Sequence, residues 1–294
     1  MTFSAAQCAR AEIGVILPVD GYILGGEYSF PIGKLHPFLD LVYDFKNSLP
    51  LYRLGGKYEL SDQVLNLNYG HWLNLNIPDF GYQKGIEASL VSDHGNDGYY
   101  KLAVFEGGVD NTDGHKWEDD FTETSYLYFK FIKSPYLQGT TQVKFDGDVT
   151  LGKVSGEDNL YYVVNLKLPV KFNYFKIYPS LGYIKQTDAL KPHYDLTYFV
   201  RGMEYKSRTG TRLASLTLEE QFPLFGKSET ILKYLYGSVF ADTGDVFDDF
   251  SGFKLRSDVG VGLVINVGIG LVRLDETLSD EGKTRFVLST QTAF

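Results

Sequence analysis

Segments in which apolar residues alternate with polar or small ones recur along the whole chain, and this period of two constrains the fold more than any other feature. Leu65, Leu67 and Tyr69 alternate in this way, and so do Val259 and Val261 farther along. Because successive side chains of a β-strand point to opposite faces, each segment would bury one face and expose the other. The chain is therefore expected to be all-β.

The alternating segments have the length of strands that cross a membrane. A tilted transmembrane strand needs about ten residues, and the chain has no run of about eighteen apolar residues that would form a membrane helix instead. We expect sixteen strands, an even number that closes an antiparallel sheet into a single transmembrane β-barrel. The expected strands span residues 11–18, 21–30, 38–45, 51–60, 63–72, 85–92, 98–107, 122–132, 139–149, 160–170, 174–185, 211–222, 229–241, 256–266, 268–275 and 284–294.

The connections between these strands alternate in length. Those after even-numbered strands are mostly short, such as 61–62, and those after odd-numbered strands are mostly longer, such as 108–121 and 186–210. Outer-membrane barrels have short turns on the periplasmic side and long loops outside. Both termini are therefore predicted to be periplasmic, with a remnant or lead-in over residues 1–10 and the barrel over 11–294.

Aromatic residues favour a membrane barrel over a soluble β-sandwich, whose strands would also alternate. The chain contains 22 Tyr and 21 Phe, and pairs such as Tyr52 and Tyr58 lie near strand ends, where membrane proteins form interfacial belts. The net charge of -9 argues against a nucleic-acid partner, which would require a basic face. We expect an integral protein of the bacterial outer membrane in contact with lipid, exported by a signal that is then removed.

The residue types that carry chemistry are not arranged as catalytic or metal sites. Cys8 is the only cysteine and can form neither a disulfide within the chain nor a thiolate cluster. None of the five histidines accompanies a serine motif. Asp242, Asp245, Asp248 and Asp249 lack the spacing of an EF-hand loop. We expect no catalytic residue, no metal and no cofactor, and therefore no enzyme.

Four motifs in residues 196–294 resemble a known family when they are taken in order. The first motif, Val200-Arg201-Gly202-Met203, lies in the longest connection, and the second, residues 218–224, ends in an aromatic residue, Pro and Leu. In the third, residues 239–244, Phe, Asp and Gly are spaced by single residues. The fourth consists of the last two expected strands, at residues 270–275 and 286–294. They resemble the barrel of the outer-membrane assembly and translocation superfamily, which includes BamA, TamA and the two-partner-secretion transporters. Met203 stands where that family usually has an aromatic residue, and Gln221 where it commonly has Arg.

The resemblance implies that the loop containing Arg201, the family's loop six, folds into the lumen. A latch of Val200, Arg201, Gly202 and Met203 would then meet Glu219, Asp242 and Gly244 on the inner wall, and Phe286, Leu288 and Phe294 would form the signal of the last strand. The residues agree, because Asp242 shares a strand face with Phe240 and a carboxylate cannot face lipid at low cost. An Arg–carboxylate pair there would make charge-assisted, bidentate hydrogen bonds. The alternative is an ordinary solvated Arg201.

Two functions stay open at this point. Members of the superfamily that insert or translocate proteins carry periplasmic POTRA domains ahead of the barrel, and the residues before Glu12 leave no room for one. The first hypothesis is insertion or translocation of unfolded outer-membrane proteins with a separate periplasmic or envelope partner, at a weak seam between the first and last strands. The second is a stand-alone diffusion pore or structural envelope protein that has lost client handling. A ligand-gated channel would need a plug domain, which this sequence lacks.

Overall fold

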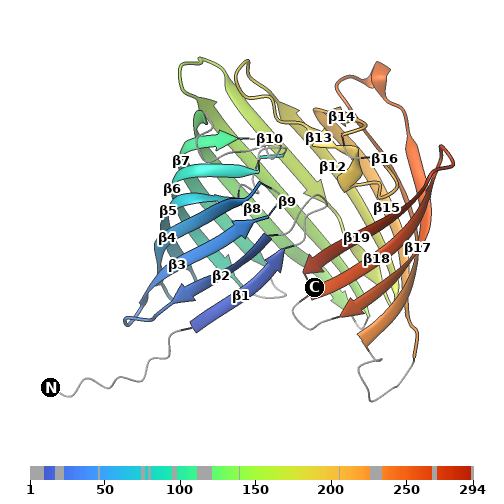
Figure 1. Cartoon of the computed structure of the whole chain (residues 1–294), viewed down its shortest axis with the longest axis horizontal. Helices are drawn as coiled ribbons and strands as arrows, with labels where there is room; N and C mark the ends of the chain where they lie inside the picture. Colours follow the sequence, from blue (N-terminus) through green and yellow to red (C-terminus); the bar gives the residue numbers. More distant parts are fainter. Residues whose placement is uncertain are drawn as a thin grey trace.

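The protein was studied as a computed structural model, in which most of the chain forms one curved antiparallel sheet (Figure 1). The structure describes residues 10–16, 23–45, 47–73, 77–78, 81–94, 98–110, 121–138, 140–204, 206–225, 234–266 and 270–292. The sheet has seventeen strands. They are β1 (Arg10–Ile16), β2 (Ile23–Ser29), β3 (Leu35–Asp44), β4 (Leu49–Glu59), β5 (Val64–Leu73), β6 (Tyr82–Asp93), β7 (Tyr99–Asp110), β8 (Thr122–Gln138), β9 (Thr141–Val154), β10 (Leu160–Lys167), β11 (Val170–Phe172), β12 (Phe175–Lys185), β15 (Arg212–Pro223), β16 (Leu235–Phe247), β17 (Arg256–Asn266), β18 (Gly270–Ser279) and β19 (Thr284–Thr292).

The difference between sixteen expected strands and seventeen observed ones arises at a proline. β10 and β11 both pair with β9 on one side and β12 on the other, so together they occupy the place of one strand. Pro169 lies between them and has no N–H to donate to the ladder. The ladder continues around it through the Leu168 N–H, which donates to the Pro179 carbonyl at 3.1 Å. The expected all-β architecture is confirmed.

Several strands are longer than the alternation predicted. β8 reaches Gln138 and β9 reaches Val154. β16 has the expected length but lies six residues farther along the chain, at Leu235–Phe247 in place of 229–241, so residues that had been assigned to a loop are part of the sheet. These residues include Asp245, whose carboxylate is paired with Arg208. A paired carboxylate is compatible with a strand, whereas sequence pattern alone treats a run of Asp as a loop.

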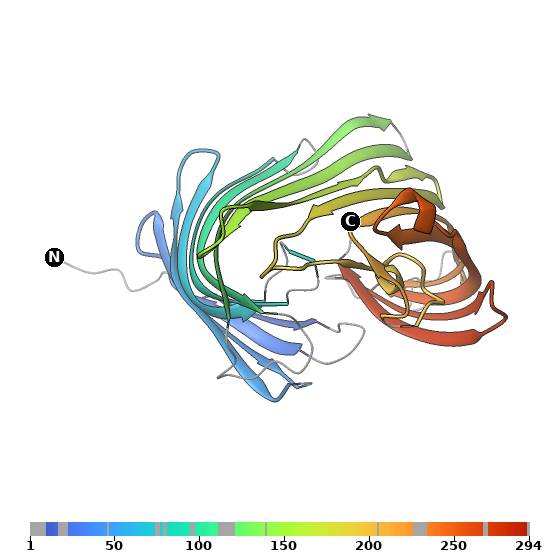
Figure 2. The same cartoon turned by 90° about the horizontal axis from the view of Figure 1, so that it is seen from above.

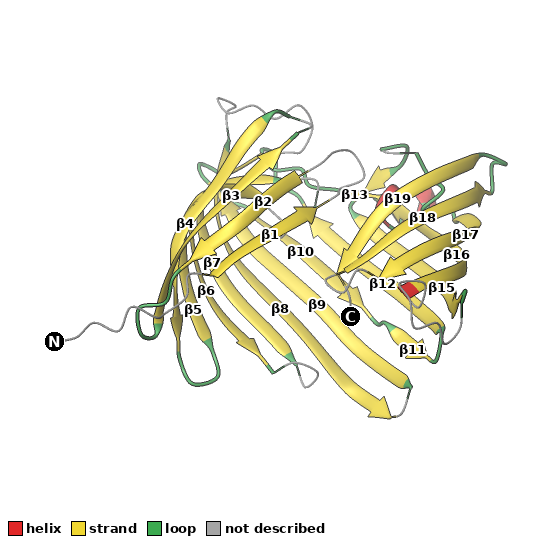
Figure 3. Cartoon of the chain, turned by 60° about the horizontal axis from the view of Figure 1, so that its bottom comes forward, coloured by secondary structure: helices red, strands yellow, loops and turns green. Residues whose placement is uncertain are grey.

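The sheet curves into a barrel that is open along one side (Figure 2). The strands pair antiparallel in chain order, and the described pairings include none between β1 and β19. Figure 3 shows these two strands apart, with β9 and β10 of the opposite wall visible between them. We call the gap between β1 and β19 the seam.

The two faces of the sheet differ in polarity. Leu54 of β4, Leu181 of β12 and Val261 of β17 point outward and are 58%, 56% and 55% exposed. The neighbouring inward positions are polar, and ion pairs bridge adjacent strands there: Arg53 to Asp40 at 2.9 Å and Lys101 to Glu87 at 3.1 Å. An apolar exterior around a polar inner wall is the pattern of a membrane barrel.

The two ends of the barrel are also different. Because the paired strands are antiparallel, β1 begins and β19 ends on the same side, which we call the terminal rim. The opposite side, the loop rim, carries the connections 186–211 and 248–255. Of the described residues, only 3-10 turns such as η2 (Leu196–Tyr198) and η4 (Phe250–Gly252) are helical. No helix among them is long and apolar enough to cross a membrane.

The polarity of the outer face predicts the effect of one charge. Leu54→Arg should destabilise the barrel in phospholipid vesicles by about 2–4 kcal/mol, because the guanidinium would face the apolar part of the bilayer. Urea titration followed by tryptophan fluorescence measures this change. Leu54→Ala is the matched control and should be much milder. Equal stability of the Arg and Ala variants would mean that lipid does not cover this face.

Candidate functional site

Residues 186–211, loop six, connect β12 to β15 and fold into the curve of the sheet (Figure 2). The loop has internal structure: β13 (Tyr194–Asp195) pairs with β14 (Thr209–Gly210). The Asp195 carboxylate accepts hydrogen bonds from the backbone N–H of Thr197 at 3.0 Å and of Lys206 at 2.8 Å. These contacts are internal to loop six and stabilise its conformation independently of the barrel wall.

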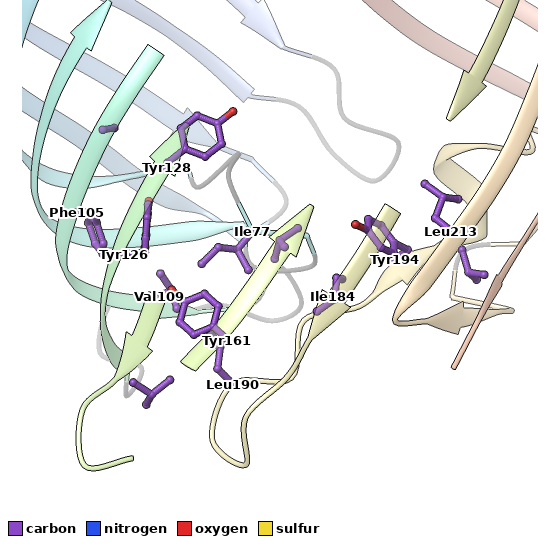
Figure 4. Close-up of a cluster of buried hydrophobic side chains, with 14 of the residues drawn as sticks. Ile77, Phe105, Val109, Tyr126, Tyr128, Tyr161, Ile184, Leu190, Tyr194 and Leu213 are labelled. Atoms are coloured by element: carbon purple, nitrogen blue, oxygen red, sulfur yellow. The ribbon is translucent and has the colours of Figure 1, made fainter. Parts of the chain in front are cut away.

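One side of loop six is apolar. Leu190, Leu196 and Val200 are fully buried in a cluster that also contains Phe105 of β7 and Tyr161 of β10. Figure 4 shows these wall side chains directed toward the loop. Burying a large apolar side chain contributes roughly 1.5–3 kcal/mol, so this cluster holds the loop inside the barrel.

Tyr194 fixes the position of the loop within this cluster. Its ring lies against Gly182 of β12, where an added Cβ would be 2.5 Å from the ring. Its hydroxyl donates to Asn165 Oδ1 of β10 at 2.7 Å. A larger residue at 182 would displace the ring, so Gly182 serves as the slot for Tyr194.

The other side of loop six is charged. The Arg201 guanidinium bonds Asp242 of β16 through Nε at 2.7 Å and through Nη2 at 3.1 Å. It also reaches Asp275 of β18 at 3.1 Å and Glu219 of β15 at 3.4 Å. These carboxylates are 1%, 0% and 3% exposed at the side chain. One loop residue thus connects three strands.

The surroundings of Arg201 keep it charged. Burial alone would lower the pKa of Arg201, but the hydrogen bond and negative charge of Asp242, with Glu219 and Asp275, raise it above its ordinary value. The guanidinium also stacks on the Phe240 ring, with Cζ 3.4 Å from the centroid. Phe240 and Asp242 therefore bind the same cation from two sides.

A second buried arginine completes this cluster. Arg273 of β18 is 2% exposed and bonds both carboxylate oxygens of Glu219, at 2.8 and 2.9 Å. It also bonds Asp275, at 3.2 Å. Glu219 further accepts from the side-chain amide of Gln221, whose own oxygen accepts from Lys176 at 2.9 Å. A Gln at 221 is therefore compatible with the site, because Arg273 supplies the guanidinium.

The remaining latch residues have separate contacts. The Gly202 N–H donates to Asp258 of β17, and a Cβ at 202 would be 2.9 Å from that carboxylate oxygen, so glycine allows this close approach. Val200 and Met203 are buried in the apolar cluster. The Met203 carbonyl accepts a hydrogen bond from Arg285 of β19. Methionine can fill this irregular space in place of an aromatic ring.

Other residues expected at the site have different positions. Gly244 lies against Ala214 and Ser215 of β15, and none of the described contacts joins it to Arg201. Phe286 and Leu288 are 71% and 53% exposed on the outer face of β19. Phe294 lies outside the described residues.

A second arginine of loop six is held at the loop rim. Arg208 bonds both oxygens of Asp245, one of them at 2.7 Å through Nη2, and donates to the Gly252 carbonyl at 2.7 Å. Asp248 accepts from the Thr211 N–H at 3.0 Å. Asp245 at the end of β16 and Asp248 directly after it therefore hold loop six at the loop rim.

Sequence reasoning missed Arg273, Asp275 and Asp258. Arg273 and Asp275 flank Leu274, which is 50% exposed on the outer face, so strict alternation places both of them inward. Asp258 next to Val259 follows the same rule. A search for charged residues at inward positions would have found all three.

The charged cluster predicts a large effect of one substitution. Arg201→Ala should lower the free energy of unfolding by about 3–5 kcal/mol, because it leaves the buried Asp242 carboxylate without its cation. Loop six should also become sensitive to protease. Arg201→Lys should restore only part of the stability, since an ammonium cannot form the bidentate bond. Unchanged proteolysis of the Ala variant would contradict a latch.

The pair of Arg273 and Glu219 predicts non-additive substitutions. Arg273→Met and Glu219→Leu should each destabilise strongly, because each removes the partner that makes two hydrogen bonds to a buried charge. The double variant should be more stable than the sum of the two single effects predicts, by about 0.5–3 kcal/mol. Urea unfolding of the four proteins measures the coupling. Simple additivity would show that the two charges do not interact.

Comparison with known proteins gives matches in structure but none in sequence. No protein-family model matches the chain, and no curated protein matches it. BamA from Haemophilus ducreyi lacking POTRA domains 1-3 is similar, with TM-score 0.68 and 15% identity over 97% of this chain and 70% of that one. CdiB from Acinetobacter baumannii has TM-score 0.54 and 13% identity over 96% of this chain and 58% of that one. OccK10 (OpdN) from Pseudomonas aeruginosa has TM-score 0.50 and 12% identity over 98% and 99%. The chain has the fold of a BamA-like outer-membrane β-barrel.

Proposed function

We propose that this protein is an integral barrel of the bacterial outer membrane that helps to insert or translocate unfolded outer-membrane proteins. It would work at the seam, with a separate periplasmic or envelope partner that delivers the client. The observation that carries this proposal is the seam itself, because β1 and β19 are not paired with each other in the described part of the chain. The BamA-like fold supports it.

The seam leaves two strand edges without a ladder partner. A backbone N–H or C=O in the apolar core of a membrane costs several kcal/mol when it has no hydrogen bond. An incoming strand that pairs with either edge would satisfy these groups by β-augmentation. Main-chain pairing requires no particular client sequence, so the seam suits a broad range of client strands.

Loop six supports the same route. Its apolar side and Arg201 fix it inside the curve of the sheet, against both the β7–β10 wall and the β15–β18 wall. A polypeptide would have to displace this buried loop to pass through the lumen. The seam therefore offers the path that breaks fewer buried contacts, with the loop rim outside and the terminal rim in the periplasm.

A disulfide across the seam tests the proposal. Ile13→Cys with Leu288→Cys would join β1 to β19 under oxidising conditions, and insertion of an unfolded barrel protein into liposomes that contain this chain should then fall at least tenfold. Reduction should restore it. Leu274→Cys with Leu288→Cys is the matched control, because it joins β18 and β19 at positions that already pair. Full activity with the seam closed would overturn the proposed route.

A diffusion pore is the second candidate, and the polar inner wall favours it. Glu27 pairs with Lys57, Asp40 with Arg53, and Glu87 with Lys101, which are side chains suited to a wet lumen. Planar-bilayer recordings of the wild type and Arg201→Ala separate the two functions. A steady wild-type conductance that the substitution enlarges would establish the pore. A closed wild type agrees with insertion at the seam.

A further inference from the structure

We propose that the outer face of the loop rim binds phosphate groups of lipid headgroups in the outer leaflet through Lys153, Lys185 and Arg212. We call these three residues the basic cluster. The inference requires only that the barrel lies in a membrane, and it does not depend on client insertion or on the seam. The basic cluster is on the sector formed by β9, β10, β12 and β15.

Strand alternation places the three cations on the outer face. Lys153 follows the exposed Val149 and Leu151 on β9 at a spacing of two residues, and Lys185 follows the exposed Leu181 and Tyr183 on β12. The inward neighbours Gly152 and Ile184 are buried. Lys153 and Lys185 therefore continue an outward apolar stripe to its end at the loop rim.

Arg212 continues the same face on the next strand. Tyr183 of β12 is directly opposite Arg212 of β15, and Tyr162 of β10 is directly opposite Lys185. The rings of Tyr162 and Tyr183 contact each other at 5.6 Å between centroids. Residues diagonal across a strand pair lie roughly 7–8 Å apart, so one phosphate-bearing headgroup can reach Lys185 and Arg212 together.

Cation–π contacts with tyrosines indicate the depth at which the basic cluster lies in the membrane. Lys185 Nζ lies 5.9 Å from the Tyr162 centroid, and Arg212 Cζ lies 5.7 Å from the Tyr183 centroid. Tyrosines at strand ends occupy the headgroup level of a bilayer. Cations next to them on the water side are therefore level with lipid phosphates.

Two carboxylates, Asp249 and Glu123, lie near the basic cluster, and neither forms a described ion pair with it. Among the described residues, no ion pair joins a carboxylate to Lys153, Lys185 or Arg212. Asp249 is near enough to Arg212 to act on it electrostatically, but Asp249 accepts hydrogen bonds from Ser251 and from the Gly252 N–H at 3.0 Å. Glu123 lies beside the basic cluster on β8, two residues from the partner of Lys153.

Two other outward sectors near the loop rim carry acidic residues. Glu106 on β7 and Glu276 on β18 are exposed on the outer face. The chain as a whole has a net charge of -9. Three cations on the four adjacent strands β9, β10, β12 and β15 therefore form a basic area on an acidic protein. Such an area favours an anionic ligand.

An exposed apolar surface beside the basic cluster favours a lipid over a free anion. Phe250 of η4 is 79% exposed and lies under the Arg212 guanidinium at 5.3 Å. Phe253 and Leu255 of the same loop are 43% and 56% exposed. A soluble phosphate would gain nothing from these side chains, whereas a headgroup joined to acyl chains would cover them.

Native mass spectrometry can test the inference. The protein would be reconstituted in nanodiscs of phosphatidylcholine with a minor fraction of phosphorylated lipid A, and the lipid A retained after release would be counted. Replacing Lys153, Lys185 and Arg212 with Gln should weaken retention by about fivefold for each cation. Lipid A without phosphate should not be retained preferentially by any variant.

A second triple variant controls for net charge. Lys34→Gln, Lys133→Gln and Lys171→Gln together remove the same charge from exposed positions nearer the terminal rim and should leave retention unchanged. Equal retention by the wild type and the basic-cluster variant would overturn the inference. Displacement of bound lipid A by excess inorganic phosphate would overturn it as well, because the site would then take free phosphate.

Discussion

Arg201 binds three buried carboxylates that come from three different strands, and the position of loop six depends on this contact. The loop has no strand ladder to hold it in the barrel, so its location must come from side chains. The planar guanidinium donates in fixed directions. It bonds Asp242 through Nε and Nη2, Asp275 through Nη1, and Glu219 through Nη2. Glu219 and Asp275 are also paired with Arg273, but the described cation of Asp242 is Arg201, so the wall carboxylate and the loop stabilise each other.

The apolar and charged sides of loop six contribute in different ways. The cluster around Leu196, Phe105 and Tyr161 supplies burial, which is not directional and would tolerate small shifts of the loop. The bonds of Arg201, and the Gly202 N–H on Asp258, are directional and select one register. A barrel of this many strands is too wide for its own side chains to fill, so a loop that enters it must be both stabilised and aligned.

Much of the fold could be predicted from the sequence, because a period of two determines which face each residue takes. Leu67 and Asp242 lie on the faces that alternation assigned to them. The contact of Arg201 with Asp242 and Glu219 was expected only because the motifs around these residues resemble a known family. The apolar cluster could not be predicted, since Leu190, Tyr194 and Leu196 follow no strand period and meet Phe105 only in the folded barrel. Arg273 was missed because the motif at residues 270–275 was used for its resemblance to a family, and the face that each of its residues takes was not considered.

Loop six also makes the two sides of the seam unequal. Arg285 of β19 donates to the Met203 carbonyl, and Arg273 and Asp275 of β18 belong to the charged cluster, so the last two strands are tied to the loop. The described polar contacts of loop six include bonds to β15, β16, β17, β18 and β19, and its apolar cluster includes Trp72 of β5. β1 is held by its ladder to β2. On the proposed route through the seam, β19 would therefore be the more firmly held edge and β1 the edge that moves. An incoming strand would then meet one stable edge and one that can yield.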